Sequence, residues 1–185
     1  MIGGTGDDRF YVDQAGDVVM EHSAGGYDRV YASIDHALAE NVEVAVATGT
    51  DDVNLTGNAE ANWLTGNAGS NVILGLAGRD RLQGRDGDDT PDGGADNDVL
   101  EGGAGADLFR FGADGGIDQV LDFELGIDLL EFENASFADL VIEDSRFGAK
   151  ISFDAADGSN ALFLNNILAA EVTVSSFAGT NEVIA

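Results

Sequence analysis

A nine-residue period in the middle of the chain constrains its fold more than any other feature. Seven units follow one another without insertion from residue 48 to residue 110, and the last two read GGADNDVLE and GGAGADLFR. Glycine recurs at positions 1, 2 and 4 of the unit, aspartate at position 6 and an apolar residue at position 8. Tandem units of this kind predict a solenoid in which each unit packs against its neighbours.

Less regular copies of the unit precede this array. Residues 3–11, 12–20 and 23–31 keep much of the pattern, and two extra residues separate the second copy from the third. Between 32 and 47 the period lapses into ASIDHALAENVEVAVA, which we expect to form a longer bridging coil. We therefore expect degenerate repeats and a bridging coil at 1–47, followed by a regular roll at 48–123.

Each unit predicts a tight turn followed by a short strand. The glycines suit a turn that needs positive φ and close backbone approach. A three-residue strand centred on position 8 points one side chain inward, so two units make one 18-residue coil and alternate units stack into two parallel sheets. Because proline has no amide to donate, we expect a local distortion at Pro91. The expected core residues are Leu55, Ile73, Pro91 and Phe109 in one sheet, and Leu64, Leu82, Leu100 and Val120 in the other.

The core of such a roll is too thin to fold unaided, because one inward side chain per unit offsets little of the entropy of ordering the chain. Ca²⁺ is the natural source of further stability, since it takes about six to eight oxygen ligands from carboxylates and carbonyls. Loops rich in glycine and aspartate offer both kinds of oxygen. An EF-hand does not fit, because a loop begun at Asp86 has Pro91 at position 6 and Asn97 at position 12.

The pattern resembles the G-G-x-G-x-D-x-U-x repeat of the RTX (repeats-in-toxin) family over roughly the first two thirds of the chain. This resemblance implies an all-β fold, a parallel β-roll whose loops bind several calcium ions. It also implies that the aspartate at position 6 and the carbonyls of loop glycines and their neighbours are the ligands. The metal-binding residues expected on this basis are Asp8, Asp28, Gly75, Ala77, Asp80, Gly84, Asp86, Asp89, Gly93, Ala95, Asp98, Gly102, Ala104, Asp107, Asp118 and Asp122.

Loops on the same edge of the regular roll lie 18 residues apart, and this spacing determines where ions are expected. One ion should lie between Asp80 and Asp98, and another between Asp89 and Asp107. A further loop after the array would pair Asp98 with Asp118.

Several residues depart from the pattern. Position 6 is Val53, Asn62 and Asn71 in the earlier units, so we expect sites before about residue 75 to be weak or empty. Asp96 replaces the glycine at position 4, which is tolerable because aspartate visits the left-handed region. The resemblance also makes Asp122 a ligand at the final site.

After residue 120 the chain changes to short runs of alternating apolar residues, which predict an antiparallel β cap at 124–185 over the open end of the solenoid. AKISFD and ALFLNN, separated by a turn signal at 155–160, predict a hairpin. ILAAEVTVSSF is compatible with either a helical turn or a strand.

The stretch GIDQVLDFELGIDLLEF and the terminus Glu182, Val183, Ile184, Ala185 resemble the C-terminal region of serralysin-like type I secreted proteases. That resemblance implies recognition of the C-terminus by a type I ABC exporter. An ordinary final β-strand is the alternative, and the two are compatible.

Composition excludes several classes of function. The chain has 35 acidic and 8 basic residues, a formal charge of −27, so it lacks the cations that a nucleic-acid partner or an anionic membrane surface requires. It has no cysteine for disulfides or thiolate metal sites, and no apolar run approaches the ~18 residues of a membrane span. The opening MIGGTGDDRF is unlike a signal peptide and begins inside a repeat, so we expect the C-terminal piece of a larger protein.

The sequence assembles no reaction centre. H-E-x-x-H, G-x-S-x-G and a phosphate loop with lysine are missing, and His22 and His36 are most simply surface or turn residues. We predict a non-catalytic, calcium-binding bacterial module that folds outside the cell and supports the type I secretion and stability of an attached upstream protein. The alternative is a calcium-dependent module that binds an anionic polysaccharide or acts as an adhesive, as the resemblance to repeat modules of uronan epimerases implies.

Overall fold

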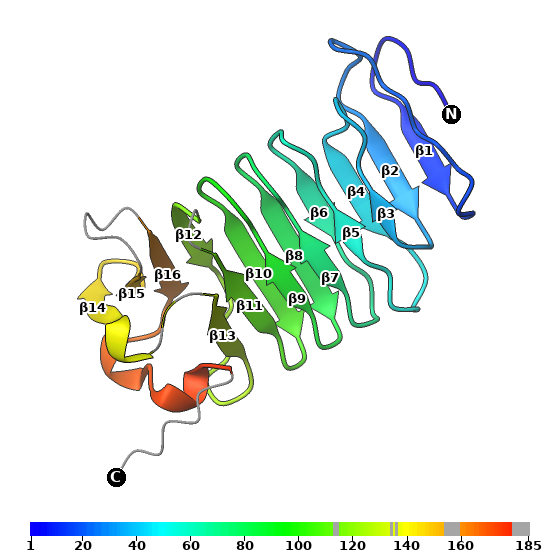
Figure 1. The fold of residues 1–185 in the computed structure, drawn as a ribbon. Coiled ribbons are helices and arrows are strands. Elements are labelled where there is room, and N and C mark those ends of the chain that lie inside the picture. The colour runs from blue at the N-terminus through cyan, green and yellow to red at the C-terminus, as the bar shows by residue number, and fades with distance from the viewer. Residues whose placement is uncertain (113–114, 134, 136, 154–159, 179–185) are drawn as a thin grey trace.

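The computed structural model describes residues 1–112, 115–133, 135, 137–153 and 160–178. Over these residues the chain winds into an elongated two-sheet solenoid (Figure 1). The ten-stranded sheet contains, in spatial order, β1 (Arg9–Val12), β2 (Arg29–Ala32), β4 (Val44–Ala47), β6 (Trp63–Thr65), β8 (Arg81–Asp86), β10 (Val99–Ala104), β12 (Ile117–Val120), β16 (Ala161–Asn165), β15 (Gly148–Ser152) and β14 (Val141–Ser145). The six-stranded sheet contains β13 (Leu129–Phe132), β11 (Leu108–Phe111), β9 (Thr90–Asp92), β7 (Val72–Leu74), β5 (Leu55–Thr56) and β3 (His36–Ala37).

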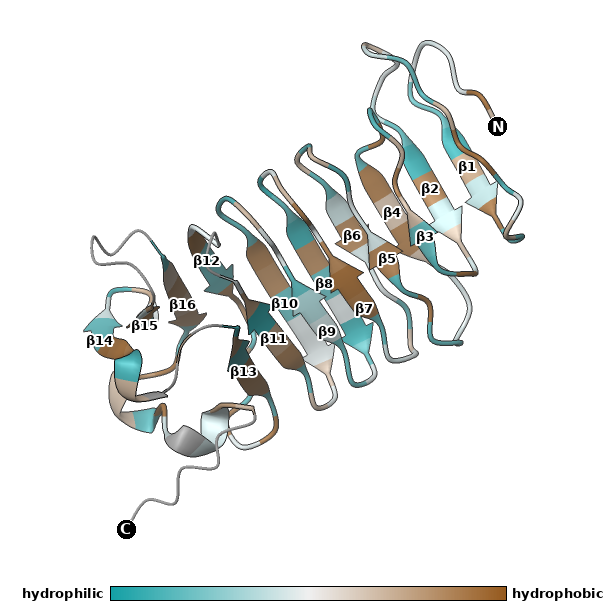
Figure 2. Cartoon of the chain, viewed as in Figure 1, coloured by the Kyte–Doolittle hydropathy of each residue, from teal (hydrophilic) through white to brown (hydrophobic). Residues whose placement is uncertain are grey.

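Parallel pairing between alternate strands confirms the predicted β-roll. Leu64 pairs with Leu82 and Leu82 with Leu100 in the ten-stranded sheet, while Leu55 pairs with Ile73 in the six-stranded sheet. The expected core residues Leu55, Leu64, Ile73, Leu82, Leu100, Phe109 and Val120 are all 0% exposed. Figure 2 shows the hydrophobic segments recurring on consecutive strands of the roll. One apolar residue per unit, at position 8, therefore builds the continuous core between the sheets.

The turn at position 4 adopts the left-handed conformation that the repeat requires. Gly78 and Gly87 have φ of 100° and 110°, and Asp96 holds the same place with φ of 77°. An aspartate can therefore replace glycine there without altering the turn.

Pro91 lies in β9 and is buried, with Ile73 beside it in β7. On its other side the ladder to β11 is reduced to the single pair Asp92 with Arg110. The amide of Leu108 donates to the carbonyl of Asp89 at 2.8 Å, and the next rung would need the amide that proline lacks. This is the local distortion expected from the sequence.

The bridging coil at 32–47 gives one strand to each sheet, β3 and β4. The copy at 12–20 differs from the regular unit, because after Val12, the last residue of β1, it forms no named strand and its only isolated bridge joins Met20 to Ile2. There the carboxylate of Asp17 accepts the amides of Asp13 and Gln14 and so closes a local turn.

The parallel roll extends further along the chain than expected. β13 was expected within the antiparallel region, but it pairs in parallel with β11, Leu130 beside Phe109. The reason is a further repeat unit at 123–131, which keeps Gly126 at position 4, Asp128 at position 6 and Leu130 at position 8. The division of the chain into domains stays a prediction.

An antiparallel cap follows the roll, as predicted. β14 pairs with β15 and β15 with β16, while β16 joins the roll by parallel pairing with β12. The expected hairpin is thus the β15–β16 pair, although its turn at 154–159 lies outside the described residues. The segment that was compatible with a helical turn or a strand forms two short 3-10 turns, η2 (Ala169–Glu171) and η3 (Val174–Ser176); the third, η1 (Phe137–Asp139), precedes β14.

Phenylalanines close this end of the core. The ring of Phe132 lies 5.4 Å from Phe111, 4.6 Å from Phe153 and 5.8 Å from Phe177, between ring centroids. In the described part of the chain no helix has the length and apolarity to cross a membrane.

Candidate metal centre

The loops along each edge of the roll stack so that the residues at position 6 meet. The amide of Asp80 donates to Oδ1 of Asp98 at 2.8 Å, and the amide of Asp98 donates to Oδ1 of Asp118 at 3.0 Å. On the opposite edge the amide of Asp89 donates to Oδ1 of Asp107 at 2.8 Å. The structure thus brings together the three expected pairs of aspartates, two of them 18 residues apart and the third 20 residues apart; that each pair shares an ion stays a prediction.

The second carboxylate oxygen of four of these aspartates has no partner. Oδ2 of Asp80, Asp89, Asp98 and Asp107 is buried without a hydrogen bond, and each residue is at most 2% exposed. Burying a charged oxygen without a hydrogen bond lowers the stability of the fold by several kcal/mol, on the order of the loss of a hydrogen bond to a charged group or more. The ionised arrangement is therefore unfavourable unless a positive charge faces these oxygens, and without one the carboxyl groups hold their protons more tightly.

Burial alters the acidity of these side chains accordingly. Loss of hydration raises the pKa of Asp80 and of Asp89 to about 7, and that of Asp98 and Asp107 to about 6. Neighbouring carboxylates contribute in the same direction, while the amides of the preceding loop oppose the shift. The same cause raises the pKa of Asp118 to about 8.

The unpartnered oxygens face backbone carbonyls across a space that glycine leaves open. A Cβ added at Gly75 would collide with both Oδ2 of Asp80 and the carbonyl oxygen of Gly93. A Cβ added at Gly84 would collide in the same way with Oδ2 of Asp89 and the carbonyl of Gly102. Glycine at position 1 therefore leaves a space between consecutive loops of one edge, bordered by the position-6 carboxylate and by the carbonyl of the next loop. We call this space a cradle.

The donors of these cradles fit a hard cation. Each combines a buried carboxylate oxygen with a carbonyl oxygen of the next loop, and Ca²⁺ prefers such ligands. Gly75, Gly84, Gly93 and Gly102 are all buried, whereas Ala77 and Ala95 are half-buried and pair with each other in a bridge between adjacent loops.

In the two preceding loops an amide group occupies the corresponding place. Asn71, at position 6, donates its Nδ2 to the carbonyl of Val53 at 2.8 Å and to Oδ1 of Asn67 at 3.1 Å. Asn62 likewise donates to the carbonyl of Val42 at 3.2 Å. These side chains satisfy the neighbouring carbonyls themselves, so these two loops contain no buried carboxylate at position 6 that requires an ion.

Three further expected ligands are exposed or already accept hydrogen bonds. Asp86 is exposed at the end of β8, and the carbonyl of Ala104 accepts the amide of Gly87 at 2.9 Å. Asp122, expected at the final site, accepts the amides of Gly102 and Gly103 with its two oxygens at 3.0 and 2.9 Å. Asp122 therefore lies on the opposite edge from Asp118, because the chain has already crossed the roll by that point.

Two residues of the ladder were missed from the sequence. Asp128 is 2% exposed and accepts the amide of Asp107 at 3.0 Å, and its other oxygen accepts the amide of Glu124 at 2.7 Å. Glu43 accepts the amide of Asp28 at 2.7 Å. The signal for Asp128 was the G-x-D-x-U core of its unit, which lacks glycine at positions 1 and 2; Glu43 had no such signal.

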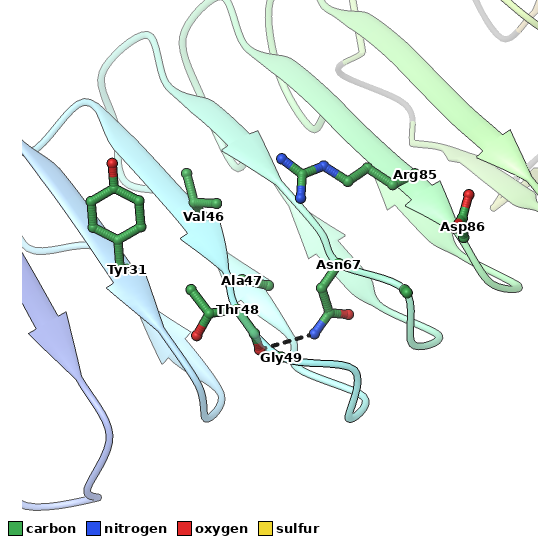
Figure 3. A pocket seen from close by; sticks show the side chains of 9 residues that line it. Tyr31, Val46, Ala47, Thr48, Gly49, Asn67, Arg85 and Asp86 are labelled. Carbon is green, nitrogen blue, oxygen red and sulfur yellow. Dashed lines mark hydrogen bonds between the residues drawn. The ribbon is translucent and has the colours of Figure 1, made fainter.

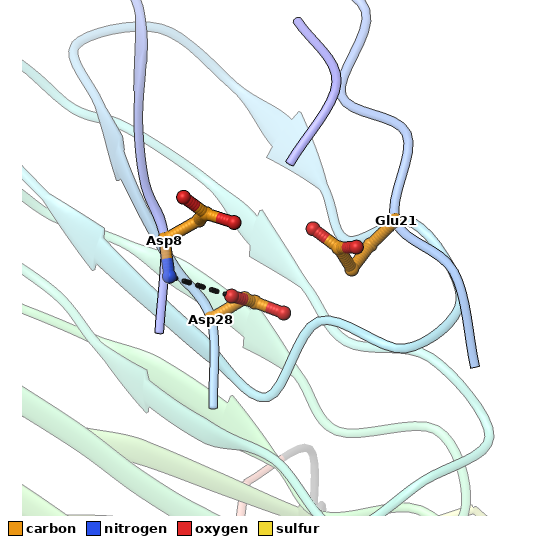
Figure 4. Close-up of side chains that lie close together, drawn as sticks. All are labelled: Asp8, Glu21 and Asp28. Carbon is orange, nitrogen blue, oxygen red and sulfur yellow. Dashed lines mark hydrogen bonds between the residues drawn. The ribbon is translucent and has the colours of Figure 1, made fainter. Parts of the chain in front are cut away.

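The expected ligands Asp8 and Asp28 lie together at the N-terminal end of the roll, where the amide of Asp8 donates to Oδ1 of Asp28 at 2.7 Å. Glu21 joins them, and carboxylate oxygens of the three residues lie within 4.8 Å of one another (Figure 4).

The outer face of the ten-stranded sheet is unlike the rest of this acidic molecule. Arg9, Arg29, Arg81 and Arg85, four of the eight basic residues, lie on β1, β2 and β8. Tyr11 stacks on Tyr31 with 5.3 Å between ring centroids, and the guanidinium of Arg81 lies 5.8 Å from the ring of Trp63. A groove of ≈ 580 Å³ lies on this face, and Tyr31 and Arg85 are among its lining residues (Figure 3).

Comparison with known proteins supports this description. The family model for the RTX calcium-binding nonapeptide repeat (4 copies) matches residues 56–91 and 83–118, the segment that contains the four unpartnered aspartates. No curated protein sequence matches the chain.

Solved structures resemble the chain along most of its length. The extracellular lipase LipA from Serratia marcescens has 16% identity and a TM-score of 0.54 over 95% of this chain and 37% of the lipase, a likeness of fold. The AlgE6R3 subunit of the Azotobacter vinelandii mannuronan C5-epimerase has 28% identity and a TM-score of 0.45 over 75% of this chain and 89% of the subunit.

Proposed function

This chain carries RTX calcium-binding nonapeptide repeats across residues 56–118, and from that premise we propose that it is a non-catalytic module that folds on binding Ca²⁺ outside the cell. In this role it supports the type I secretion and the stability of an attached upstream protein. The observation that carries the proposal is the row of buried, unpartnered Oδ2 atoms of Asp80, Asp89, Asp98 and Asp107.

In the proposed sites, Asp80 and Asp98 with the carbonyl of Gly93 hold an ion on one edge of the roll. Asp89 and Asp107 with the carbonyl of Gly102 hold an ion on the other edge. When bound, Ca²⁺ supplies the positive charge that the buried oxygens lack, and the glycines of position 1 leave room for it.

Calcium then controls folding through linkage. An ion that binds only the folded chain stabilises it by mass action, and the −27 formal charge opposes compaction when no ion is bound. Because free calcium is low in the cytosol and higher outside, the chain stays extended before export and folds after it. Secretion itself rests on the terminal residues Glu182–Ala185, which lie outside the described residues, as a signal for a type I ABC exporter.

Far-UV circular dichroism with and without EGTA tests the folding half of the proposal. We expect a β-sheet spectrum and a compact elution volume in Ca²⁺, and a disordered spectrum with a larger elution volume in EGTA. Mg²⁺ at the same concentration is the control and should leave the chain unfolded. A full β-sheet spectrum in EGTA would refute calcium-dependent folding.

Export is tested separately in a bacterial host that carries a type I exporter. Deletion of residues 182–185 should abolish appearance in the medium and leave calcium-dependent folding of the purified chain unchanged. Export of the deleted chain at the level of the full chain would contradict the assignment of the signal.

The basic and aromatic outer face favours a second candidate function, the binding of an anionic polysaccharide. Stacked or exposed rings such as Tyr11 and Trp63 suit contact with sugar faces, and arginines pair with carboxylates in a fork geometry. The chain has a formal charge of −27, so most of its surface repels an anionic polymer. Half of its basic residues lie on this one sheet face, where they provide a local attraction for such a polymer.

Titration of the calcium-loaded chain with a polyuronate, and with a neutral polysaccharide as control, tests this candidate. Arg85→Gln should weaken polyuronate binding several-fold, and Arg146→Gln, which lies in the antiparallel cap, should not. Absence of polyuronate binding at low ionic strength would exclude the candidate and leave the folding module unaffected.

A further inference from the structure

The N-terminal end of the roll contains a second kind of acidic site, outside the residues that match the repeat family. Asp8 precedes β1, Asp28 precedes β2, and Glu21 lies in the coil between these strands. Figure 4 shows the three carboxylates facing a common space, with their ligand oxygens within 4.8 Å of one another.

Two of these side chains are buried and incompletely paired. Asp28 is 0% exposed; its Oδ1 accepts the amide of Asp8 and its Oδ2 has no partner. Glu21 is 9% exposed; its Oε1 accepts the amide of His22 at 2.8 Å and its Oε2 has no partner. The two ion pairs found in the described residues, at Arg81 and Arg110, lie elsewhere.

Glycines border the cluster as they border the cradles of the array. A Cβ at Gly3 would collide with Oε2 of Glu21 and approach Oδ2 of Asp8 to 2.9 Å, and a Cβ at Gly25 would meet Oε1 of Glu21 at 2.5 Å. The space beside the unpartnered oxygens is thus kept free of side chains on two sides.

We propose that Glu21, from outside the nonapeptide, completes a calcium site with Asp8 and Asp28, the position-6 aspartates of the copies at 3–11 and 23–31. Glu21 occupies no position of the nonapeptide, because it is one of the two extra residues between the units at 12–20 and 23–31. Three carboxylates from three segments replace the carboxylate and carbonyl of a repeat cradle, and all-oxygen ligands of this charge suit a hard divalent cation.

The site would join the irregular coil between β1 and β2 to the end of the roll. It is separated from the proposed ion sites of the later units by the first three units of the array, whose position-6 residues are Val53, Asn62 and Asn71 and hold no carboxylate. Calcium would therefore order the chain at two places, the array and the N-terminal coil. The choice of Ca²⁺ over other hard cations rests on the proposed function.

Glu21→Gln is the direct test, because it keeps the size of the side chain and removes its charge; Glu40→Gln, an exposed glutamate in the bridging coil, is the matched control. Calcium titration calorimetry should show one ion fewer for Glu21→Gln and the wild-type number for Glu40→Gln. Hydrogen exchange followed by mass spectrometry should show that calcium protects residues 13–28 in the wild type and no longer does so in Glu21→Gln. Protection of residues 75–111 by calcium should be retained in both variants.

Hydrogen exchange of the wild-type chain tests the N-terminal site even if a variant fails to fold. Calcium protection at 75–111 without any at 13–28, or an unchanged ion number in a folded Glu21→Gln, would overturn this site and leave the proposed function intact. Absence of calcium protection at both places would overturn the proposed function as well. Equal protection of 13–28 by Mg²⁺ alone would overturn the assignment to calcium.

Discussion

The amide of Asp80 donates to Oδ1 of Asp98, 18 residues further along the chain, while Oδ2 of Asp98 is buried with no partner. The carboxylate of Asp98 thus has two separate roles, because Oδ1 accepts a backbone hydrogen bond and Oδ2 faces the cradle. The ladder bond needs an acceptor only, whereas the second oxygen needs a positive charge.

The substitution Asp98→Asn keeps the hydrogen-bond acceptor and removes the charge. The amide oxygen can still accept the amide of Asp80, but the charge at the cradle is lost, so the calcium concentration for half-folding should rise about tenfold or more. Asp96→Asn in the same loop makes the same change in charge at an exposed residue whose φ of 77° asparagine tolerates. Calcium titrations followed by circular dichroism should give the control a midpoint near wild type; equal midpoints for the two variants would contradict the cradle.

Acidity should weaken calcium binding near neutrality. Folded-state pKa values of about 6 for Asp98 and Asp107 and about 7 for Asp80 and Asp89 lie above the ordinary value of 3.8. The ion-free fold therefore binds more protons than the unfolded chain, so its stability is greatest below about pH 4 and falls as the pH rises through 6 to 7.

Calcium-dependent stability has the opposite dependence on pH, because calcium binds the ionised carboxylates. Each proton that an ion must displace reduces the apparent calcium affinity by about tenfold per pH unit below the pKa. The half-folding calcium concentration, measured at about pH 8, 7 and 6 and constant ionic strength, should increase as the pH falls. A midpoint independent of pH over this range would show that these aspartates are not the ligands.

Gly75→Ala tests the space of the cradle without a change of charge. The added methyl group collides with Oδ2 of Asp80 and with the carbonyl of Gly93, so we expect a loss of about 1–3 kcal/mol in calcium-loaded stability. Gly16→Ala is the control, since a Cβ at Gly16 has nothing within 4 Å. Thermal unfolding in saturating calcium should separate the two variants, and equal melting temperatures would mean that the loop relaxes around the methyl group.

The loops that have Asn62 and Asn71 at position 6 allow a carboxylate to be added rather than removed. Asn71→Asp removes the donation from Nδ2 to the carbonyl of Val53 and buries a carboxylate in its place, at a cost of about 1–3 kcal/mol. The variant should therefore need more calcium to fold than the wild type, as measured by calcium titration followed by circular dichroism. A lower calcium midpoint for Asn71→Asp would contradict this expectation and would mean that the new carboxylate binds an ion of its own, which outweighs the lost amide bond.

The repeating part of the fold was predictable because its period determines which residues face inward and which loops stack. Leu82 and Leu100 occupy one row, and Asp80 meets Asp98, as the 18-residue coil requires. Asp128 was missed because its unit keeps Asp and Leu at positions 6 and 8 but has no glycine at positions 1 and 2.

Other features depend on contacts that no period describes. Asp122 accepts the amides of Gly102 and Gly103, which lie 20 and 19 residues earlier in the chain. Glu21 joins Asp8 and Asp28 through an irregular coil, and the amide of Asn71 fills its cradle only because the carbonyl of Val53 lies within reach. Such relationships follow from three-dimensional proximity and leave no pattern in the sequence.

Pro91 is the one inward position of the regular array without an amide, and its replacement should stabilise the roll. Pro91→Leu supplies a donor for the missing rung beside Leu108 and fills the buried position between Ile73 and Phe109, so we expect about 0.5–1.5 kcal/mol of added stability in the calcium-loaded form. Pro91→Ala restores the amide without the side chain and should give a smaller gain or a loss, depending on the cavity it leaves. The measurement is thermal unfolding in saturating calcium. A lower melting temperature for Pro91→Leu would show that the core at β9 has no room for leucine, and that proline is the better-packed residue despite the missing hydrogen bond.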